Sequence, residues 1–255
     1  MSDTTHDSPA SDTLNGFEAE QADTPRVVVL ISGNGSNLQA LIDAQSYGEL
    51  GGEIVAVISN KVDAYGLKRA RDAEIDAVAL PHNEYDSREA FDGALIKVIE
   101  RHEPDLIVLA GFMRILTPLF VHRFHGRLLN IHPSLLPAYQ GLNTHARVLA
   151  DGGEEHGVSV HFVTEELDGG PVVMQAALKI HPGDSQEDVI EKIHAREHLI
   201  YPIAVRWFLE GRLQLGPKGA TLDGMALPPQ GMRLSHEDAA EDLDEDRDEN
   251  QDEDD

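Results

Sequence analysis

Residues 27–41 read VVVLISGNGSNLQAL, and the order of residue types in this stretch predicts the fold class. Its first five residues, Val27–Ile31, form a continuous apolar run, which predicts a strand buried on both faces. A glycine-rich segment follows directly, and the apolar residues after it recur at helical spacing. A strand, a glycine turn and a helix in this order are typical of an α/β protein.

The same alternation of strands and helices continues along the chain. It predicts strands at 54–59, 77–80, 106–110 and 128–131, with helices at 64–72, 86–102 and 117–124. Two longer strands, 158–163 and 171–180, predict an antiparallel extension, and Ser185 begins a long helix that Pro202 is expected to kink or split. We therefore predict a single α/β domain with a mostly parallel sheet, an antiparallel C-terminal extension and helices on both faces.

The charge of the chain is concentrated at its two ends. Of 255 residues, 46 are acidic and 20 are Lys or Arg, so the formal net charge is −26. Residues 1–24 carry −6 and residues 235–255 carry −12, which leaves −8 for residues 25–234. We predict that both ends are disordered acidic tails, with an interaction role as the alternative. Abundant acid with little Lys also suggests a surface adapted to high salt.

Composition also excludes several classes of function. No basic stretch resembles a nucleic-acid footprint, and no apolar run is long enough to span a membrane. The acidic N-terminus lacks the apolar region of a secretory signal, so we predict a cytoplasmic protein. Without Cys there are no disulfides or thiol nucleophiles, and without a His-Glu-x-x-His motif no metal site is predicted.

The glycine-rich segment Ser32–Asn37 is a candidate phosphate site. Glycines let the backbone approach a ligand, and free N–H groups at a helix start favour an anion. The alternative is an ordinary turn between a strand and a helix. The dinucleotide-binding motif is excluded because Leu38 stands where its third glycine would be, and no Gly-Lys-Ser/Thr of a P-loop follows.

Polar residues at the end of the 128–131 strand suggest acyl transfer. Asn130 and His132 are two residues apart, so on a strand they point to the same side. An amide donor and a titratable imidazole suit a developing oxyanion and a leaving amine. Asp168, which precedes two glycines, is either a turn former or a carboxylate that favours the imidazolium form of His132. A strand-end histidine bound only to backbone remains the alternative for His132.

Four segments together closely resemble the phosphoribosylglycinamide formyltransferases. They are 27–41, quoted above, and LAGFMRILTP at 109–118, LLNIHPSLLP at 128–137 and HGVSVHFVTEELDGGPV at 156–172. The resemblance extends from about residue 26 to about residue 212. It implies a Rossmann-like formyltransferase fold, with a catalytic domain at 25–215 and a C-terminal extension at 216–234. It also implies transfer of a formyl group from 10-formyltetrahydrofolate to phosphoribosylglycinamide, the third step of purine synthesis.

The resemblance also assigns roles to individual residues. The implied catalytic residues are Asn130, His132 and Asp168, and the implied phosphoribosylglycinamide-binding residues are Gly35, Ser36, Asn37 and Glu197. The implied folate-binding residues are Arg88, Met113, Arg114, Ile115, Leu116, Asn130, Thr164, Glu165, Glu166, Leu167 and Asp168. No metal is implied. The expected partners are therefore small molecules, without nucleic acid or membrane, and the chain is expected to be a monomer or a homodimer.

Two positions beside the expected site depart from this resemblance. Gln140 stands where family members often have Pro, and Asn143 stands where they often have His. Both departures bear on the rigidity of a loop and leave the expected catalytic groups in place.

Related activities remain as alternatives. A 10-formyltetrahydrofolate hydrolase would use the same groups, but its relatives usually carry an N-terminal regulatory domain. A methionyl-tRNA formyltransferase would call for a basic C-terminal domain, and this C-terminus is acidic. A non-catalytic folate- or nucleotide-binding module is the third alternative.

Overall fold

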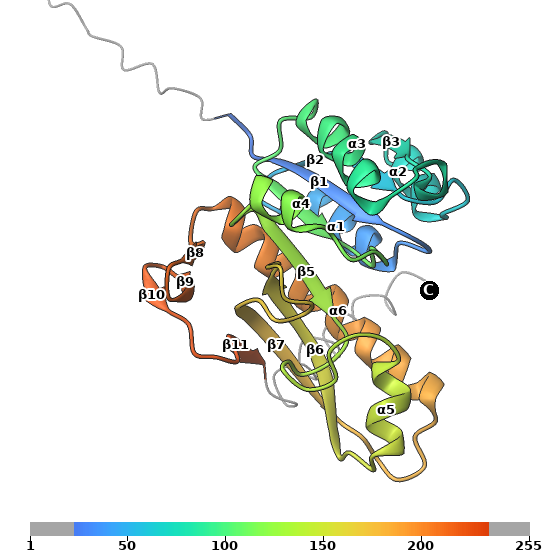
Figure 1. Ribbon diagram of the computed structural model, residues 1–255. Helices are drawn as coiled ribbons and strands as arrows, with labels where there is room; N and C mark the ends of the chain where they lie inside the picture. The colour runs from blue at the N-terminus through green and yellow to red at the C-terminus, as the bar shows by residue number, and fades with distance from the viewer. Residues whose placement is uncertain (1–22, 235–255) are drawn as a thin grey trace, which may run out of the picture.

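An eight-stranded sheet runs through the computed structural model, which describes residues 23–234 (Figure 1). The strand order is β11-β7-β6-β5-β4-β1-β2-β3. The strands are β1 (Arg26–Ile31), β2 (Glu53–Ser59), β3 (Asp76–Ala79), β4 (Leu106–Leu109), β5 (Leu128–His132), β6 (Glu155–Phe162), β7 (Val172–Lys179) and β11 (Met232–Leu234). The predicted tails, apart from residues 23 and 24, lie outside the described residues.

Strand directions confirm the predicted fold class. Strands β1 to β5 are parallel, whereas β6 pairs antiparallel with both β5 and β7. A second sheet consists of β8 (Leu213–Gly216), which begins before the expected extension at 216–234, and of β9 (Gly219–Leu222) and β10 (Met225–Ala226) within it. The chain then returns as β11, which pairs parallel with β7 and was not predicted.

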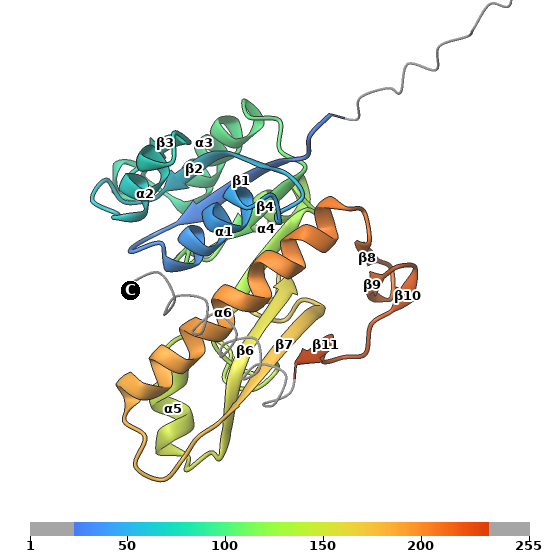
Figure 2. The same cartoon turned by 180° about the vertical axis from the view of Figure 1, so that it is seen from behind.

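Helices cover both faces of the sheet (Figure 2). Val27, Val29 and Ile31 face one core with α1 (Ser36–Ser46), α2 (Gly66–Asp72) and α6 (Gln186–Leu209). The alternate residues Val28 and Leu30 face the other core with α3 (Arg88–Glu100) and α4 (Pro118–Arg123). The short α5 (Thr144–Ala150) packs against α6, and η1 (His82–Glu84) is a single 3-10 turn. Burial on two faces explains why Val27–Ile31 of β1 contains no polar residue.

Pro202 was expected to kink or split helix α6, and the structure shows that it does not split it. The helix is continuous from Gln186 to Leu209, although Pro202 cannot donate a backbone hydrogen bond. Its start is the predicted one, because Ser185 and Asp188 form a reciprocal capping box. The helix lies along the sheet, and the hydroxyl of the fully buried Tyr201 lies within hydrogen-bond distance of the Leu109 and Leu129 carbonyls. This packing around Tyr201 holds the helix together beside the proline.

Side chains tie the carboxyl ends of the parallel strands together. Ser32 follows β1, and its hydroxyl donates to Asn60 Oδ1 after β2 at 2.6 Å. The same hydroxyl accepts from the Met113 N–H, in the loop after β4, at 2.8 Å. Ligands of open α/β sheets bind beyond this edge. The two hydrogen bonds of Ser32 therefore fix the loops after β1, β2 and β4 where a site is expected. Within residues 23–234, no helix is long and apolar enough to cross a membrane.

Candidate active site

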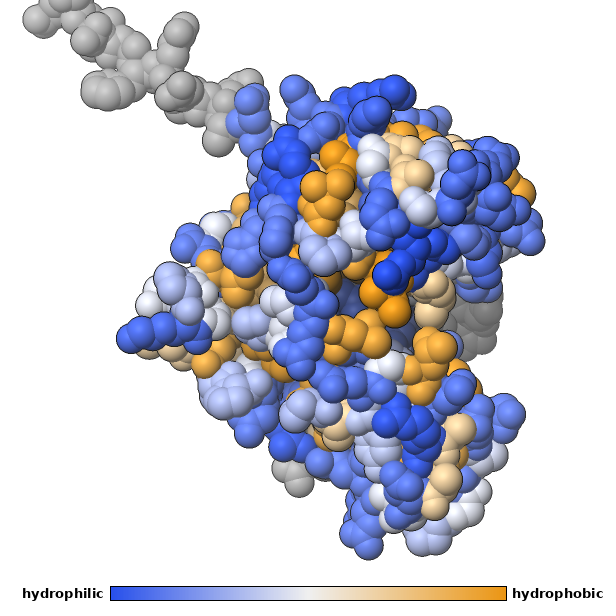
Figure 3. Space-filling model, in the orientation of Figure 1, coloured by the Kyte–Doolittle hydropathy of each residue, from blue (hydrophilic) through white to orange (hydrophobic). Residues whose placement is uncertain are grey.

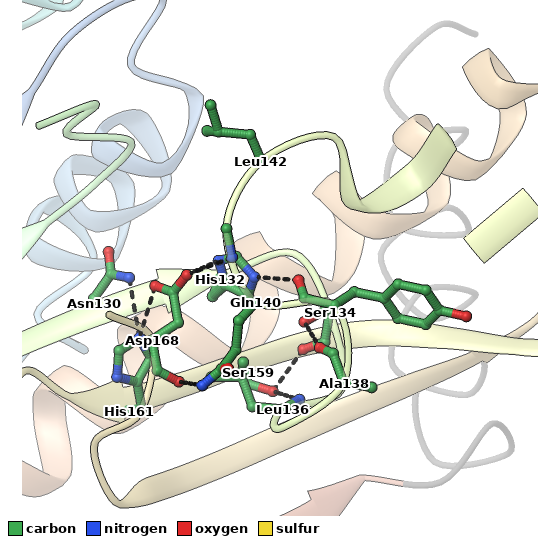
Figure 4. Close-up of polar contacts among 12 residues, drawn as sticks. Asn130, His132, Ser134, Leu136, Ala138, Gln140, Leu142, Ser159, His161 and Asp168 are labelled. Atoms are coloured by element: carbon green, nitrogen blue, oxygen red, sulfur yellow. Dashed lines mark hydrogen bonds and ion pairs between the residues drawn. The ribbon is translucent and has the colours of Figure 1, made fainter. Parts of the chain in front are cut away.

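The centre of the site is the contact between His132 and Asp168 (Figure 4). His132 ends β5, and Asp168 lies in the link between β6 and β7. His132 Nδ1 is 3.5 Å from Asp168 Oδ2, and the two side chains are only 8% and 10% exposed. His132 Nε2 is 3.0 Å from the Tyr139 carbonyl oxygen. Both ring nitrogens therefore face oxygen acceptors.

Backbone geometry holds Asp168 beside the imidazole. The Gly141 N–H donates to Asp168 Oδ2 at 2.9 Å, and Asp168 itself has a φ of 49°. That left-handed conformation is uncommon for a residue other than glycine, and an Asp adopts it more readily than most. Nearby, a Cβ on Gly170 would lie 1.8 Å from the Phe162 carbonyl oxygen. Glycine at 170 thus lets the link pass close enough to β6 to bring Asp168 to the site.

Asn130 is oriented by His161, a residue that the sequence analysis did not single out. The two residues face each other across the antiparallel β5–β6 pair. His161 Nδ1–H donates to the Phe162 carbonyl at 2.9 Å, so its Nε2 accepts from the Asn130 amide nitrogen at 3.1 Å. Burial lowers the pKa of the His161 imidazole, which keeps this acceptor neutral. One N–H of the Asn130 amide remains free for a ligand.

A cleft opens beside Asn130 and Asp168. Arg114, Ile115 and Leu116 form one part of it, and Figure 3 shows apolar surface gathered in a hollow between the part with α3 and α4 and the part with α5. The Arg114 guanidinium lies 5.0 Å from the centre of the Phe91 ring, which orients it. The full lining is Leu109, Phe112, Arg114, Ile115, Leu116, Val121, Asn130, His161, Val163, Thr164, Glu165, Glu166, Leu167 and Asp168.

Two of the expected folate-binding residues do not line this cleft. Met113 has an exposed side chain and contacts Ser32 through its backbone. Arg88 is the exposed first residue of α3, and the cap of that helix is Ser87. The remaining expected residues, from Arg114 to Leu116 and from Thr164 to Asp168, are brought together with Asn130.

The glycine-rich segment forms a rigid turn at the start of α1. Gly35 caps the helix with a φ of 77°, and a Cβ there would lie 2.9 Å from the Gly66 Cα. Glycine at 35 is therefore required both by conformation and by the close approach of α2. Arg69 of α2 donates to the Asn34 carbonyl at 3.0 Å and to Gln39 Oε1 at 2.9 Å. These contacts fix the first turn of α1, and the N–H groups of that turn, including those of Ser36 and Asn37, are a candidate anion site.

Asn37 and Glu197 form a second polar pair at this helix start. Asn37 Nδ2 donates to Glu197 Oε2 at 2.8 Å, joining α1 to α6. Both side chains are buried, and within the described chain Asn37 Oδ1 has no hydrogen-bond partner. Burial raises the pKa of Glu197 to about 7, against the opposing effect of the Asn37 hydrogen bond. A buried acceptor without a donor is an expected feature of a polar ligand site.

Other histidines gather near α5 and α6. His145 Nδ1 lies 3.1 Å from His156 Nε2, and burial lowers the pKa of His156 to about 4. His194 and His198 stand four residues apart on α6 with stacked rings. This His-x-x-x-His spacing was overlooked in the sequence analysis. Within residues 23–234, however, no group of three or more His, Asp or Glu side chains is arranged to hold a metal.

Comparison with known proteins agrees with this geometry. A family model described as formyl transferase matches residues 25–205. The chain belongs to the formyl transferase family. This formyl transferase is 57% identical over 205 residues to the phosphoribosylglycinamide formyltransferase of Escherichia coli, covering 80% of the chain and 97% of the relative. It is 50% identical to the enzyme of the same name from Haemophilus influenzae, covering 81% and 97%.

A solved structure supports the same family assignment. The phosphoribosylglycinamide formyltransferase of Coxiella burnetii, solved with CHES, is 53% identical to this formyl transferase and superposes with a TM-score of 0.80. The match covers 83% of this chain and all of the other. The family assignment therefore rests on both sequence and three-dimensional structure.

The buried carboxyl of this formyl transferase gives a testable stability profile. An unfolded Glu ionises near pH 4.5, whereas Glu197 in the folded chain ionises near 7. The unfolded state therefore loses its proton first, and the free energy of unfolding falls as the pH rises through this range. Glu197→Gln should be more stable than wild type by about 2–3 kcal/mol at pH 8 and about equally stable at pH 4.

Urea unfolding at both pH values measures this difference. Glu191→Gln, at an exposed position of the same helix, is the matched control and should give the wild-type profile. A Glu197→Gln variant whose stability relative to wild type is the same at pH 4 and pH 8 would contradict the buried-carboxyl assignment.

Proposed function

We propose that this formyl transferase transfers the formyl group of 10-formyltetrahydrofolate to the amine of phosphoribosylglycinamide. The observation that carries the proposal is the convergence of an amide donor, an imidazole and a carboxylate at one cleft: Asn130, His132 and Asp168. Relatives at 57% and 53% identity, matched over nearly their whole length, bear the name of this activity. All of the groups come from one chain, so the proposal is compatible with a monomer or a homodimer.

The acceptor substrate is assigned to the α1 end of the site. The N–H groups of Gly35, Ser36 and Asn37 at the start of an 11-residue helix suit its phosphate. Its other polar groups would reach the unpartnered Asn37 Oδ1 and the Glu197 carboxyl. These local dipoles attract an anion although the chain as a whole carries −26.

The formyl donor is assigned to the cleft beside Asn130. Ile115, Leu116 and Leu167 offer apolar surface to a flat ring, and the backbone of Thr164–Asp168 offers donors and acceptors to its edge. Arg114 lines the cleft as a cation for the carboxylate part of a folate. Arg88 and Met113 lie outside the cleft, so a contact with the donor would involve its exposed end.

The residues suggest a direct acyl transfer through a tetrahedral intermediate. The amine of the acceptor attacks the formyl carbon, a C–N bond forms, and the carbonyl oxygen becomes an oxyanion. The free N–H of Asn130 and the Nδ1–H of His132 stabilise that oxyanion. His132 Nε2–H is bound to the Tyr139 carbonyl at 3.0 Å, whereas Nδ1 lies 3.5 Å from Asp168 Oδ2, so we assign the contact with the oxyanion to Nδ1.

Completion of the transfer requires one proton to change place. The attacking amine loses a proton, and the departing N10 of the folate gains one as its bond to the formyl carbon breaks. The Asp168 carboxylate, which lies beside His132 Nδ1, is placed to pass this proton through a water. No covalent bond to the protein is needed, because both substrates occupy adjoining parts of one site.

Release of tetrahydrofolate with and without phosphoribosylglycinamide tests the function. A transferase releases tetrahydrofolate only when the acceptor is present, because the amine is the nucleophile. Release at the same rate without the acceptor would instead identify a hydrolase, and release in neither case a binding module. Following tetrahydrofolate by absorbance in parallel reactions distinguishes the three results.

His132→Ala should remove the donor to the oxyanion. We expect kcat to fall by about 10²–10⁴ while the protein stays folded, because a positioned acid typically contributes that much. Steady-state kinetics measure the loss, and circular dichroism checks the fold. His125→Ala, which alters a histidine between α4 and β5, is the control and should keep wild-type kcat. A folded His132→Ala enzyme with near-normal kcat would refute the assignment.

Asp168→Asn should change the pH dependence of kcat. The amide oxygen can still accept from the Gly141 N–H, but the negative charge beside His132 Nδ1 is gone. The decline in kcat on the alkaline side should therefore begin at lower pH than in wild type. The measurement is kcat from pH 5 to 9 for both proteins, and coincident profiles would argue against the pairing.

A further inference from the structure

Three consecutive residues contact the two members of the His132–Asp168 pair. Tyr139 offers its carbonyl oxygen to His132 Nε2, and Gly141 offers its N–H to Asp168 Oδ2. Gln140 stands between them, and its side-chain Nε2 donates to the Asp168 carbonyl oxygen at 3.1 Å (Figure 4). Segment 139–141 thus binds the pair at three points.

The backbone of Gln140 is itself held from the opposite side. Arg147 of α5 donates through Nη1 to the Gln140 carbonyl at 2.7 Å and to the Leu142 carbonyl at 3.4 Å. Its guanidinium carbon also lies 5.3 Å from the centre of the Tyr139 ring. Arg147 therefore holds segment 139–141 against α5. The Gln140 side chain joins that segment to the backbone of Asp168.

We propose that Gln140 is a positioning residue that keeps the Asp168 carboxylate against His132. It does so by binding the Asp168 peptide carbonyl, a contact that a proline at this position has no side-chain donor to make. The catalytic part of this inference rests on the proposed formyl transfer.

The conformation of Asp168 explains why its peptide group needs a partner. With a φ of 49°, Asp168 is in a conformation that its own backbone disfavours, so neighbouring contacts must maintain it. Two such contacts are the Gly141 N–H on the carboxylate and the Gln140 amide on the carbonyl. Without the second, the peptide after Asp168 can rotate, and its rotation moves the carboxylate away from His132 Nδ1.

The exposure of Gln140 sets the size of the effect. The Gln140 side chain is exposed, and a hydrogen bond near solvent contributes only modestly. Loss of this bond should therefore lower kcat by about 3- to 10-fold, far less than loss of His132. It should leave KM for phosphoribosylglycinamide unchanged, because the groups assigned to that substrate lie on α1 and α6.

Gln140→Met is the main test, because methionine is similar in length but has no donor. Gln140→Glu is the stronger perturbation, since a carboxylate repels the Asp168 carbonyl oxygen. Gln214→Met is the matched control: its amide makes the same kind of bond, to the Gly211 carbonyl at 3.1 Å, away from the site. We expect kcat in the order wild type equal to Gln214→Met, then Gln140→Met, then Gln140→Glu.

The pH profile separates positioning from a general structural role. In Gln140→Met the alkaline decline of kcat should begin at lower pH, in the same direction as in Asp168→Asn. In an Asp168→Asn background, Gln140→Met should cause no further shift, because the carboxylate it positions is already gone. A wild-type kcat and pH profile in Gln140→Met would overturn the proposal, and so would an equal shift in both backgrounds.

A measurement without substrate keeps this inference separate from the proposed function. Hydrogen exchange of the Gly141 N–H, which donates to Asp168 Oδ2, should be faster in Gln140→Met than in Gln214→Met. Faster exchange in a protein that fails to transfer formyl groups would reject the function but keep the positioning role. Equal exchange rates in the two variants would reject the positioning role.

Discussion

The proximity of a carboxylate and an imidazole, Asp168 and His132, is the constraint on which the site depends. Strand β6 runs antiparallel to β5 and ends at Phe162 beside Leu129, so the link that follows must fold back toward His132. This return requires glycine at 170, because any side chain there would collide with the Phe162 carbonyl. The close approach of the link to β6 is therefore what brings the carboxylate of Asp168 to the imidazole.

The structure also reconciles an acidic chain with anionic substrates. Most of the net charge lies outside residues 25–234, while the groups assigned to the substrates are helix N–H groups, amides and single arginines. Short-range hydrogen bonds of this kind depend on geometry more than on net charge, and Arg69 provides that geometry by bracing the glycine-rich turn. Net charge in such a protein is therefore a poor guide to the sign of its ligands.

Sequence patterns within a few residues predicted most of the fold. Contacts between residues far apart in the sequence could not be predicted from such patterns. The apolar run Val27–Ile31 predicted β1, and the Ser185 capping box predicted the start of α6, because both signals lie within a few residues. The role of His161 was missed because it depends on the β5–β6 register, which the sequence of either strand alone does not specify. Of the kink or split expected at Pro202, the split does not occur: the helix continues through the proline, beside the buried Tyr201 whose hydroxyl contacts the sheet. The resemblance named Arg88 and Met113, which lie outside the cleft.

The hydrogen bond between Asn37 and Glu197 bears on how the protein is made. It joins two residues that are 160 positions apart, one near the beginning of the fold and one in its last long helix. During synthesis the glycine-rich turn leaves the ribosome early, but its buried partner follows only when α6 has been translated. A nascent chain that ends before α6 thus has the glycine-rich turn without the carboxyl that binds Asn37. The polar pair at the start of α1 can therefore form only at a late stage of synthesis, once α6 has left the ribosome.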